Sequence, residues 1–292
     1  MASDPSASDA APAIVGALER EYNLRIRHPE RSAVYERFAA DSAALRSSHG
    51  GFETLRYGDT PNSAIDFFRA AGQDRAPLFI FIHGGYWRAL DRRIFSFLAR
   101  PWIARGVHVA LPGYDLAPAT SVRAIAGQVR RAVAQLIARA VPLGIDERRV
   151  VVSGHSAGAH LGALALDAAP GWFAAGFLGV SGLYDLEPLL ATSVNLDVRL
   201  DVAEARALSP SRRSAQRATR YRLAVGGAET DGFRQQSHDY AAALRGHGCD
   251  AESIEIPART HFDVLDDLAD ANASLFASAN ALFSHPFTGS LP

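Results

Sequence analysis

The hydrophobic positions of this chain recur in a rhythm that predicts strands alternating with helices. Short, continuous apolar runs are typical of strands buried on both faces, and amphipathic stretches between them are typical of covering helices. The predicted strands are 78–82, 107–111, 149–153, 177–180, 221–225 and 251–256, and the predicted helices are 91–104, 122–140, 157–168, 233–245 and 264–283. Such alternation indicates an α/β fold with a doubly wound, mostly parallel sheet and helices on both faces.

The remaining segments complete a single predicted domain over residues 15–292. Residues 1–14 are rich in Ala, Ser and Asp and are predicted to be a disordered tail. A helical pattern follows to about residue 46, and then two short strands at 52–58 and 63–68. The stretch 183–219 is irregular and contains two prolines, so we expect a small lid over the active site there. No second domain boundary is evident.

The composition and charge of the chain limit the classes of molecule that it is expected to bind. The 292 residues are 48% hydrophobic and 21% charged, which is typical of a globular protein, and 30 Lys+Arg nearly balance 31 Asp+Glu. This balance predicts no nucleic-acid or membrane partner. The chemical motifs described below predict a small-molecule substrate instead. Arginine heavily outnumbers lysine, which we attribute to coding bias. With neither a signal peptide nor a membrane-length apolar run, a cytoplasmic location is expected. The oligomeric state stays open, a homodimer included.

The stretch Gly154-His155-Ser156-Ala157-Gly158 carries the strongest chemical signal. It is a G-x-S-x-G motif that follows an apolar strand pattern and precedes a helix pattern. This context is typical of a nucleophile elbow, in which the serine occupies a strained turn and exposes its hydroxyl. We therefore predict that Ser156 is a catalytic nucleophile.

A serine hydroxyl needs a base, and the base needs a carboxylate to orient it. His261 follows the last predicted strand, where the histidine of an α/β-hydrolase belongs. Glu229 and Asp231 both follow the strand that ends at residue 225. We favour Glu229 as the acid, because its longer side chain still reaches the histidine, and keep Asp231 as the alternative.

The loop His83-Gly84-Gly85-Tyr86-Trp87 has the H-G-G-x form that lipases and esterases place beside the nucleophile. Its glycines allow the backbone to approach a substrate. We predict that N–H groups of Gly84, Gly85 and Ala157 form an oxyanion hole. No ligand cluster accompanies His83, so it is interpreted as a brace for the loop, and neither a metal nor another cofactor is expected.

Together these motifs resemble the arylformamidase (kynurenine formamidase) branch of the α/β-hydrolases. The resemblance spans roughly residues 20–285, and four stretches carry it. They are 83–87, 154–160, 181–189 and 261–264, with Glu21-Tyr22-Asn23 in addition. It implies nucleophile Ser156, acid Glu229 and base His261, although the better-known eukaryotic members have Asp as the acid. It also implies hydrolysis of an N-formyl aryl amide such as N-formylkynurenine.

An aryl substrate needs a flat apolar wall, and we expect Tyr86, Trp87 and Tyr184 to supply it. Two other functions remain open. A carboxylesterase acting on small or aryl esters would use the same acyl-enzyme and oxyanion, so motifs do not separate the two. An inactive hydrolase that serves as a binding module would be expected to lack part of the predicted catalytic set, which is present here.

Overall fold

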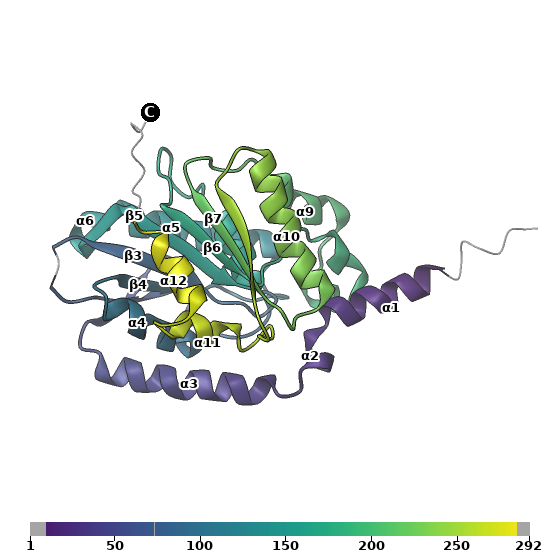
Figure 1. Cartoon of the computed structure of the whole chain (residues 1–292), viewed down its shortest axis with the longest axis horizontal. Coiled ribbons are helices and arrows are strands. Elements are labelled where there is room, and N and C mark those ends of the chain that lie inside the picture. The colour runs from purple at the N-terminus through teal and green to yellow at the C-terminus, as the bar shows by residue number, and fades with distance from the viewer. Residues whose placement is uncertain (1–9, 73, 285–292) are drawn as a thin grey trace, which may run out of the picture.

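The computed structural model describes residues 10–72 and 74–284 and contains one eight-stranded sheet (Figure 1). The strand order is β1-β2-β4-β3-β5-β6-β7-β8; β1 and β4 pair with β2 in antiparallel fashion, and all other pairs are parallel. The strands are β1 (Phe52–Arg56), β2 (Ala64–Phe68), β3 (Ala76–Ile82), β4 (His108–Pro112), β5 (Ile145–His155), β6 (Gly176–Val180), β7 (Arg220–Gly226) and β8 (Ala251–Ile256). The predicted mostly parallel α/β sheet is therefore confirmed.

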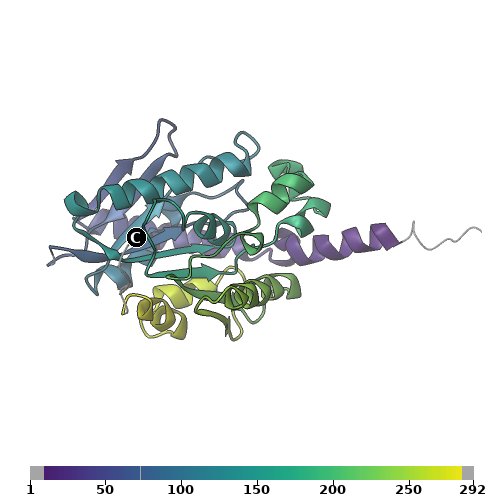
Figure 2. The same cartoon turned by 90° about the horizontal axis from the view of Figure 1, so that it is seen from above.

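Helices cover both faces of this sheet, and Figure 2 shows α5 and the pair α11–α12 on opposite sides of it. The α-helices are α1 (Ala10–Tyr22), α2 (Leu24–Arg27), α3 (Arg31–Ser48), α4 (Ala99–Ile103), α5 (Val122–Ala138), α6 (Ala140–Leu143), α7 (Ala157–Leu164), α8 (Asn195–Val198), α9 (Val202–Leu208), α10 (Asp231–Gly246), α11 (Val264–Ala269) and α12 (Ser274–Ala281). Three 3₁₀ helices are η1 (Arg92–Leu98), η2 (Glu187–Ala191) and η3 (Pro210–Arg212).

The core forms two layers because successive side chains of a strand point to opposite faces. In β3, Leu78, Ile80 and Ile82 belong to the cluster under α5 and α7. Phe79 and Phe81 of the same strand belong to the cluster under α3, α4 and α12. All seven residues of β3 are buried, which explains why its sequence is a continuous apolar run rather than an alternating one.

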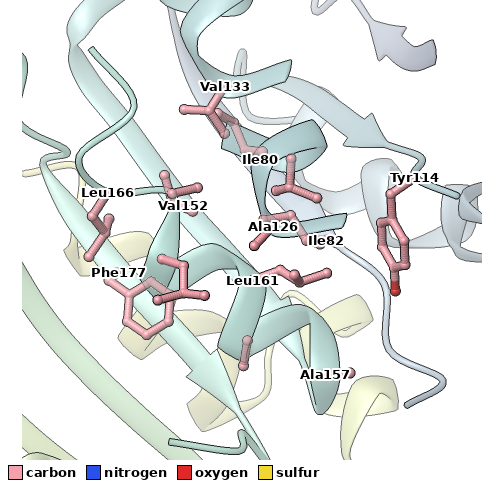
Figure 3. Packing of buried hydrophobic residues seen from close by; sticks show 14 of the residues in the cluster. Ile80, Ile82, Tyr114, Ala126, Val133, Val152, Ala157, Leu161, Leu166 and Phe177 are labelled. Carbon is pink, nitrogen blue, oxygen red and sulfur yellow. The ribbon is translucent and has the colours of Figure 1, made fainter. Parts of the chain in front are cut away.

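The first of these clusters fixes the helix that follows the G-x-S-x-G motif (Figure 3). Leu161 and Ala157 of α7 lie in it with Ile82 of β3 and Val152 of β5, all completely buried. Full burial of a Leu or Ile side chain stabilises a fold by about 1.5–3 kcal/mol. The nucleophile motif is thus connected on both sides to rigid, buried elements.

Several predicted helices are divided in the structure. Residues 92–98 are 3₁₀, and the α-helical turn begins at Ala99, which leaves Pro101 in a first turn where its missing N–H costs little. The predicted helix 264–283 is two helices, because Asp270 accepts a hydrogen bond from the N–H of Asn272 (2.9 Å) and turns the chain. Side-chain capping of this kind competes with helix hydrogen bonding, which hydrophobic periodicity does not register.

The predicted N-terminal tail and the predicted lid also differ in detail from what the structure describes. Residues 1–9 of the predicted tail lie outside the described residues, and α1 already begins at Ala10. The predicted lid 183–219 contains η2, α8, α9 and η3 rather than irregular chain alone. None of the helices in the described part of the chain is long and apolar enough to cross a membrane.

Candidate active site

Ser156 occupies a strained turn between β5 and α7. Its φ is +56°, which is rare for a residue with a side chain, and its N–H donates to the carbonyl of Val180 (2.8 Å). The turn requires glycine on either side. A Cβ on Gly158 would lie 2.0 Å from the carbonyl oxygen of Ile82, and one on Gly154 would lie 2.3 Å from that of Gly158. The strand–turn–helix geometry predicted for the elbow is present.

His261 and Glu229 meet on two loops at the C-terminal ends of β8 and β7. His261 Nδ1 lies 2.7 Å from Glu229 Oε2, and the Glu229 side chain is completely buried. The other carboxylate oxygen, Oε1, accepts from Ser181 Oγ (2.5 Å) and from the N–H of Gly226 (2.7 Å). Both oxygens therefore have partners, which compensates the burial of the charge.

Asp231, the alternative acid, lies elsewhere. It is the first residue of α10, its side chain is 92% exposed, and Arg234 is its ion-pair partner at 3.6 Å. Thr230 begins to turn the chain away from the histidine, since its hydroxyl donates to the carbonyl of Glu21. Of the two candidate carboxylates, only Glu229 contacts His261.

Free backbone N–H groups surround the serine. Within residues 10–72 and 74–284, the N–H groups of Gly84, Gly85 and Ala157 have no protein acceptor. Gly84 packs directly on the elbow, because a Cβ there would lie 3.1 Å from Ser156 Cβ and 2.8 Å from the carbonyl oxygen of His155. Unpaired N–H donors beside a nucleophile can stabilise an oxyanion as it forms.

The other histidines of the motifs are buried and hydrogen bonded. His83 stacks on Tyr114 (ring centroids 4.2 Å apart), and its Nδ1 contacts the carbonyl of Gly84. His155 contacts the carbonyl of His261 through Nε2 (2.8 Å), and His160 accepts from Trp87 and contacts the carbonyl of Leu208. Burial lowers the pKa of His83 and of His160 to about 4 and that of His155 well below its ordinary value. These three rings are neutral at pH 7.

A cavity of about 160 Å³ opens over the serine, and Ser156 and His261 both line it. An engineered cavity of about 150 Å³ holds one benzene ring, so this space suits an aromatic group. In the described structure no hydrogen bond joins Ser156 Oγ directly to His261, a common condition before substrate binds. Tyr86 lines the cavity, and its hydroxyl donates to the carbonyl of Tyr22 (2.6 Å).

The structure does not bring Trp87 and Tyr184 to this cavity. Trp87 is completely buried, and its indole N–H donates to His160 Nδ1 (3.2 Å). Tyr184 is 1% exposed and stacks on Tyr240, with ring centroids 4.3 Å apart. Both side chains belong to the hydrophobic core, because the backbone at each position directs them under the loops rather than over the serine.

The remaining aromatic lining comes from residues that the motifs did not indicate. Tyr35 of α3 and Phe262 meet edge to face (centroids 5.8 Å apart, 89°), and both line the cavity. Asn23, Leu24, Arg25 and Arg31 also line it. We call Asn23, Leu24, Arg25, Arg31 and Tyr35 the N-terminal wall. Asn23 and Phe262 lie in stretches that carry the family resemblance, whereas no sequence signal links Arg25, Arg31 or Tyr35 to the serine.

Partly buried polar contacts hold the N-terminal wall together and attach it to the body through Asn23 and Ser193. The carboxylate of Glu19 accepts from Asn23 Nδ2 (2.6 Å) and from both the N–H and the hydroxyl of Ser193 (2.7 and 2.6 Å). Arg31 Nη1 donates to the carbonyls of Arg25 (2.9 Å) and His28 (3.0 Å). The segment 183–219 thus contacts this wall through Ser193.

In the part of the chain that the structure describes, no group of three or more His, Cys, Asp or Glu residues could hold a metal ion. The chemical groups near Ser156 are instead a histidine–carboxylate pair and free backbone N–H donors.

Several known proteins are similar to this chain. The model of a family described as BD-FAE matches residues 65–168. Kynurenine formamidase of Danio rerio is 33% identical over 229 residues, which are 74% of this chain and 76% of that protein. A crystal structure of a protein from Silicibacter sp. TM1040, proposed to be a thioesterase, is similar to this chain with a TM-score of 0.78 and 32% sequence identity. The match covers 87% of this chain and 94% of that protein. The carboxylesterase EstE1 from a metagenomic library shares the fold (TM-score 0.70, 15% identity, 88% and 97% covered).

Proposed function

The chain belongs to the kynurenine formamidase family of α/β-hydrolases, and on this premise we propose that it cleaves an N-formyl aryl amide of the N-formylkynurenine type through a Ser156–His261–Glu229 triad. The observation that carries the proposal is the 2.7 Å contact between His261 Nδ1 and the buried Glu229 carboxylate, in a cavity that Ser156 also lines. An imidazole held in this way exposes Nε2 as a base. A hydrolase is the class that the family supports, and the substrate and triad are our inference.

In the first half of the proposed reaction, Ser156 Oγ attacks the formyl carbon while His261 Nε2 takes the hydroxyl proton. The carbonyl oxygen becomes an oxyanion, and the N–H groups of Ala157 and the Gly84–Gly85 loop donate to it. The intermediate collapses when the C–N bond breaks. His261 then gives its proton to the departing nitrogen, so that an arylamine leaves and a formyl ester remains on Ser156.

In the second half, water replaces the amine. His261 accepts a proton from the water as its oxygen attacks the formyl ester, and the same N–H groups stabilise the second oxyanion. Cleavage of the ester bond returns the proton to Ser156 Oγ and releases formate. Glu229 stays ionised and stabilises the imidazolium in both halves. A formyl group is small, so it fits beside Gly84, where a Cβ has no space.

Ester hydrolysis is the second candidate, as a carboxylesterase for small or aryl esters. The observation that favours it is the 32% identity to the protein proposed to be a thioesterase, since esters and thioesters pass through the same acyl-enzyme. The test compares kcat/KM for N-formylkynurenine with kcat/KM for p-nitrophenyl acetate on the same enzyme. We expect the formamide to be preferred by at least about tenfold, which is 1.4 kcal/mol of transition-state free energy. A preference for the ester would replace the proposal with the second candidate.

A further inference from the structure

The entrance of the catalytic cavity is positively charged. Its charged lining residues are three arginines, Arg25, Arg31 and Arg88, and no Asp or Glu among the described residues lines it. The chain as a whole is nearly neutral, with 30 Lys+Arg against 31 Asp+Glu. The excess of positive charge around this cavity is therefore a local feature and does not reflect the charge of the whole chain.

The three arginines differ in what they already bind. Arg31 donates to two backbone carbonyls, those of Arg25 and His28, so it is committed to holding the N-terminal wall. Arg88 pairs with Asp197 of α8 through Nη1, but its Nε is buried and has no partner within the described residues. The Arg25 side chain forms neither a hydrogen bond nor an ion pair with any described residue. Arg25 and Arg88 thus retain donors that protein groups do not use.

Nearby acidic groups offset part of this charge, but none of those described pairs with Arg25. Asp197 already pairs with Arg88 and is 46% exposed on its side chain, and Glu19 is occupied by Ser193 and Asn23. Burial and then the positive charges of Arg88 and Arg31 lower the pKa of Arg25 below its ordinary value. The guanidinium groups repel one another, and an anion placed among them would relieve that repulsion.

Neighbouring residues hold the backbone of Arg25 in place. Leu24, the preceding residue, is 4% exposed and packs in the core, and the carbonyl of Arg25 accepts from Arg31 at 2.9 Å. Arg88 follows the Gly84–Gly85 loop, and its N–H donates to the carbonyl of Gly85 (3.1 Å). The backbone of both arginines is therefore held beside the cavity, and their guanidinium groups can donate to a planar carboxylate.

We propose that Arg25 and Arg88 bind a carboxylate of the substrate at the mouth of the cavity, so that the enzyme selects aryl substrates that carry a carboxylate on the part that leaves with the amine. This inference rests on the proposed function, because it assumes that the aryl group fills the cavity over Ser156. Cleavage occurs at the serine, and the carboxylate remains at the entrance. The two arginines thereby set specificity without touching the reacting atoms.

The experiment uses Arg25→Gln, with Arg27→Gln as the matched control. Arg27 lies on the same helix, α2, but lines a different cavity. Each variant is assayed with N-formylkynurenine and with N-formyl-2-aminoacetophenone, which keeps the aryl formamide and lacks the carboxylate. Arg25→Gln is expected to lower kcat/KM about tenfold for the first substrate, mainly through KM, and less than about twofold for the second. Arg25→Lys should recover part of the loss, and Arg27→Gln should change neither value.

Equal losses on both substrates would overturn the proposal, since they would indicate a structural role for Arg25, and so would no loss on either. If the wild-type enzyme does not cleave formamides, the proposed function fails, but the charge test still applies to esters. 4-Acetoxybenzoate and phenyl acetate then replace the two formamides. A selective loss on 4-acetoxybenzoate would support the carboxylate site even in that case, and a loss shared with phenyl acetate would refute it.

Discussion

Two regions of this molecule meet at one cavity and are built in opposite ways. The loops at the C-terminal ends of β5, β7 and β8 hold Ser156, Glu229 and His261, and all three residues are at least 95% buried. The N-terminal wall belongs to α2, α3 and the link before α2, and Arg25 in it is exposed. The sheet positions the first region, whereas helices packed on the body and a few polar contacts position the second. Mutations can therefore test the proposed catalytic residues and the proposed substrate-binding residues separately.

Replacing the nucleophile should have the largest effect. Ser156→Ala removes the atom that would form the acyl-enzyme, and we expect kcat to fall by about four to six powers of ten. The matched control is Ser153→Ala in the same strand, whose buried hydroxyl has no partner within the described residues and does not line the cavity. Steady-state kinetics and circular dichroism measure both. Activity of Ser156→Ala above about a tenth of wild type would remove Ser156 from the mechanism.

The second-largest loss of activity is expected when the proposed triad acid, Glu229, is replaced. Glu229→Gln keeps a hydrogen-bonding group but favours the wrong tautomer of His261, so kcat should fall by about two to four powers of ten. Asp231→Asn should leave kcat within about twofold, because that side chain is 92% exposed. The two variants are assayed side by side. A severe loss in Asp231→Asn with near-normal Glu229→Gln would reverse the assignment and leave Ser156 and His261 unaffected.

The same contrast between the catalytic loops and the N-terminal wall explains how much of each region could be predicted from the sequence. Ser156, His261 and Glu229 could be located because each follows a recognisable strand, and parallel strands bring their ends to one edge of the sheet. Arg25 and Tyr35 could not, because their contacts with the cavity span more than a hundred residues of chain and leave no periodic signal. Coding bias does not account for the position of Arg25, Arg31 and Arg88, which all line one cavity.

Tyr86 and Trp87 show where local reasoning fails within a predicted loop. The two residues are adjacent and both have positive φ, +50° and +57°, yet one lines the cavity and the other is in the core. Both are aromatic residues in the same loop, so only the backbone conformation determines which side chain reaches the cavity. The fold class, by contrast, was predictable, because it depends on apolar runs summed over many residues.

The N-terminal wall can be loosened without touching the predicted catalytic residues. Glu19→Gln replaces one carboxylate oxygen with an NH₂ group, so some of the bonds from Ser193 and Asn23 are lost. We expect KM to rise about threefold to tenfold with kcat nearly unchanged, and the free energy of unfolding to fall by about 1 kcal/mol after allowance for solvent exposure. Glu36→Gln, exposed on α3, is the control.

The stability difference between wild type and Glu19→Gln should depend on pH. Burial opposes ionisation of Glu19, but the hydrogen bonds from Ser193 and Asn23 outweigh it and lower the pKa of Glu19 below its ordinary 4.5. A depressed pKa stabilises the folded state above the unfolded value, and this stabilisation is lost as pH falls through the folded value. Thermal unfolding should show the full difference at pH 7 and a shrinking one below about pH 4.5. A difference that is constant with pH would mean that the charge of Glu19 has no role.

The smallest effect is expected at Tyr184, the residue that sequence reasoning assigned to the substrate and the structure places in the core. Its hydroxyl is buried, packs against Gly179 and Gly182, and has no hydrogen-bond partner within residues 10–72 and 74–284. Tyr184→Phe removes that unsatisfied group and keeps the ring on Tyr240, so stability should be unchanged or rise by about 1 kcal/mol. Values of kcat and KM should stay within about twofold of wild type, in contrast to Arg25→Gln. Differential scanning calorimetry and kinetics with N-formylkynurenine measure the two. A selective rise in KM would show that Tyr184 reaches the substrate, which would extend the recognition region from the N-terminal wall into the segment 183–219.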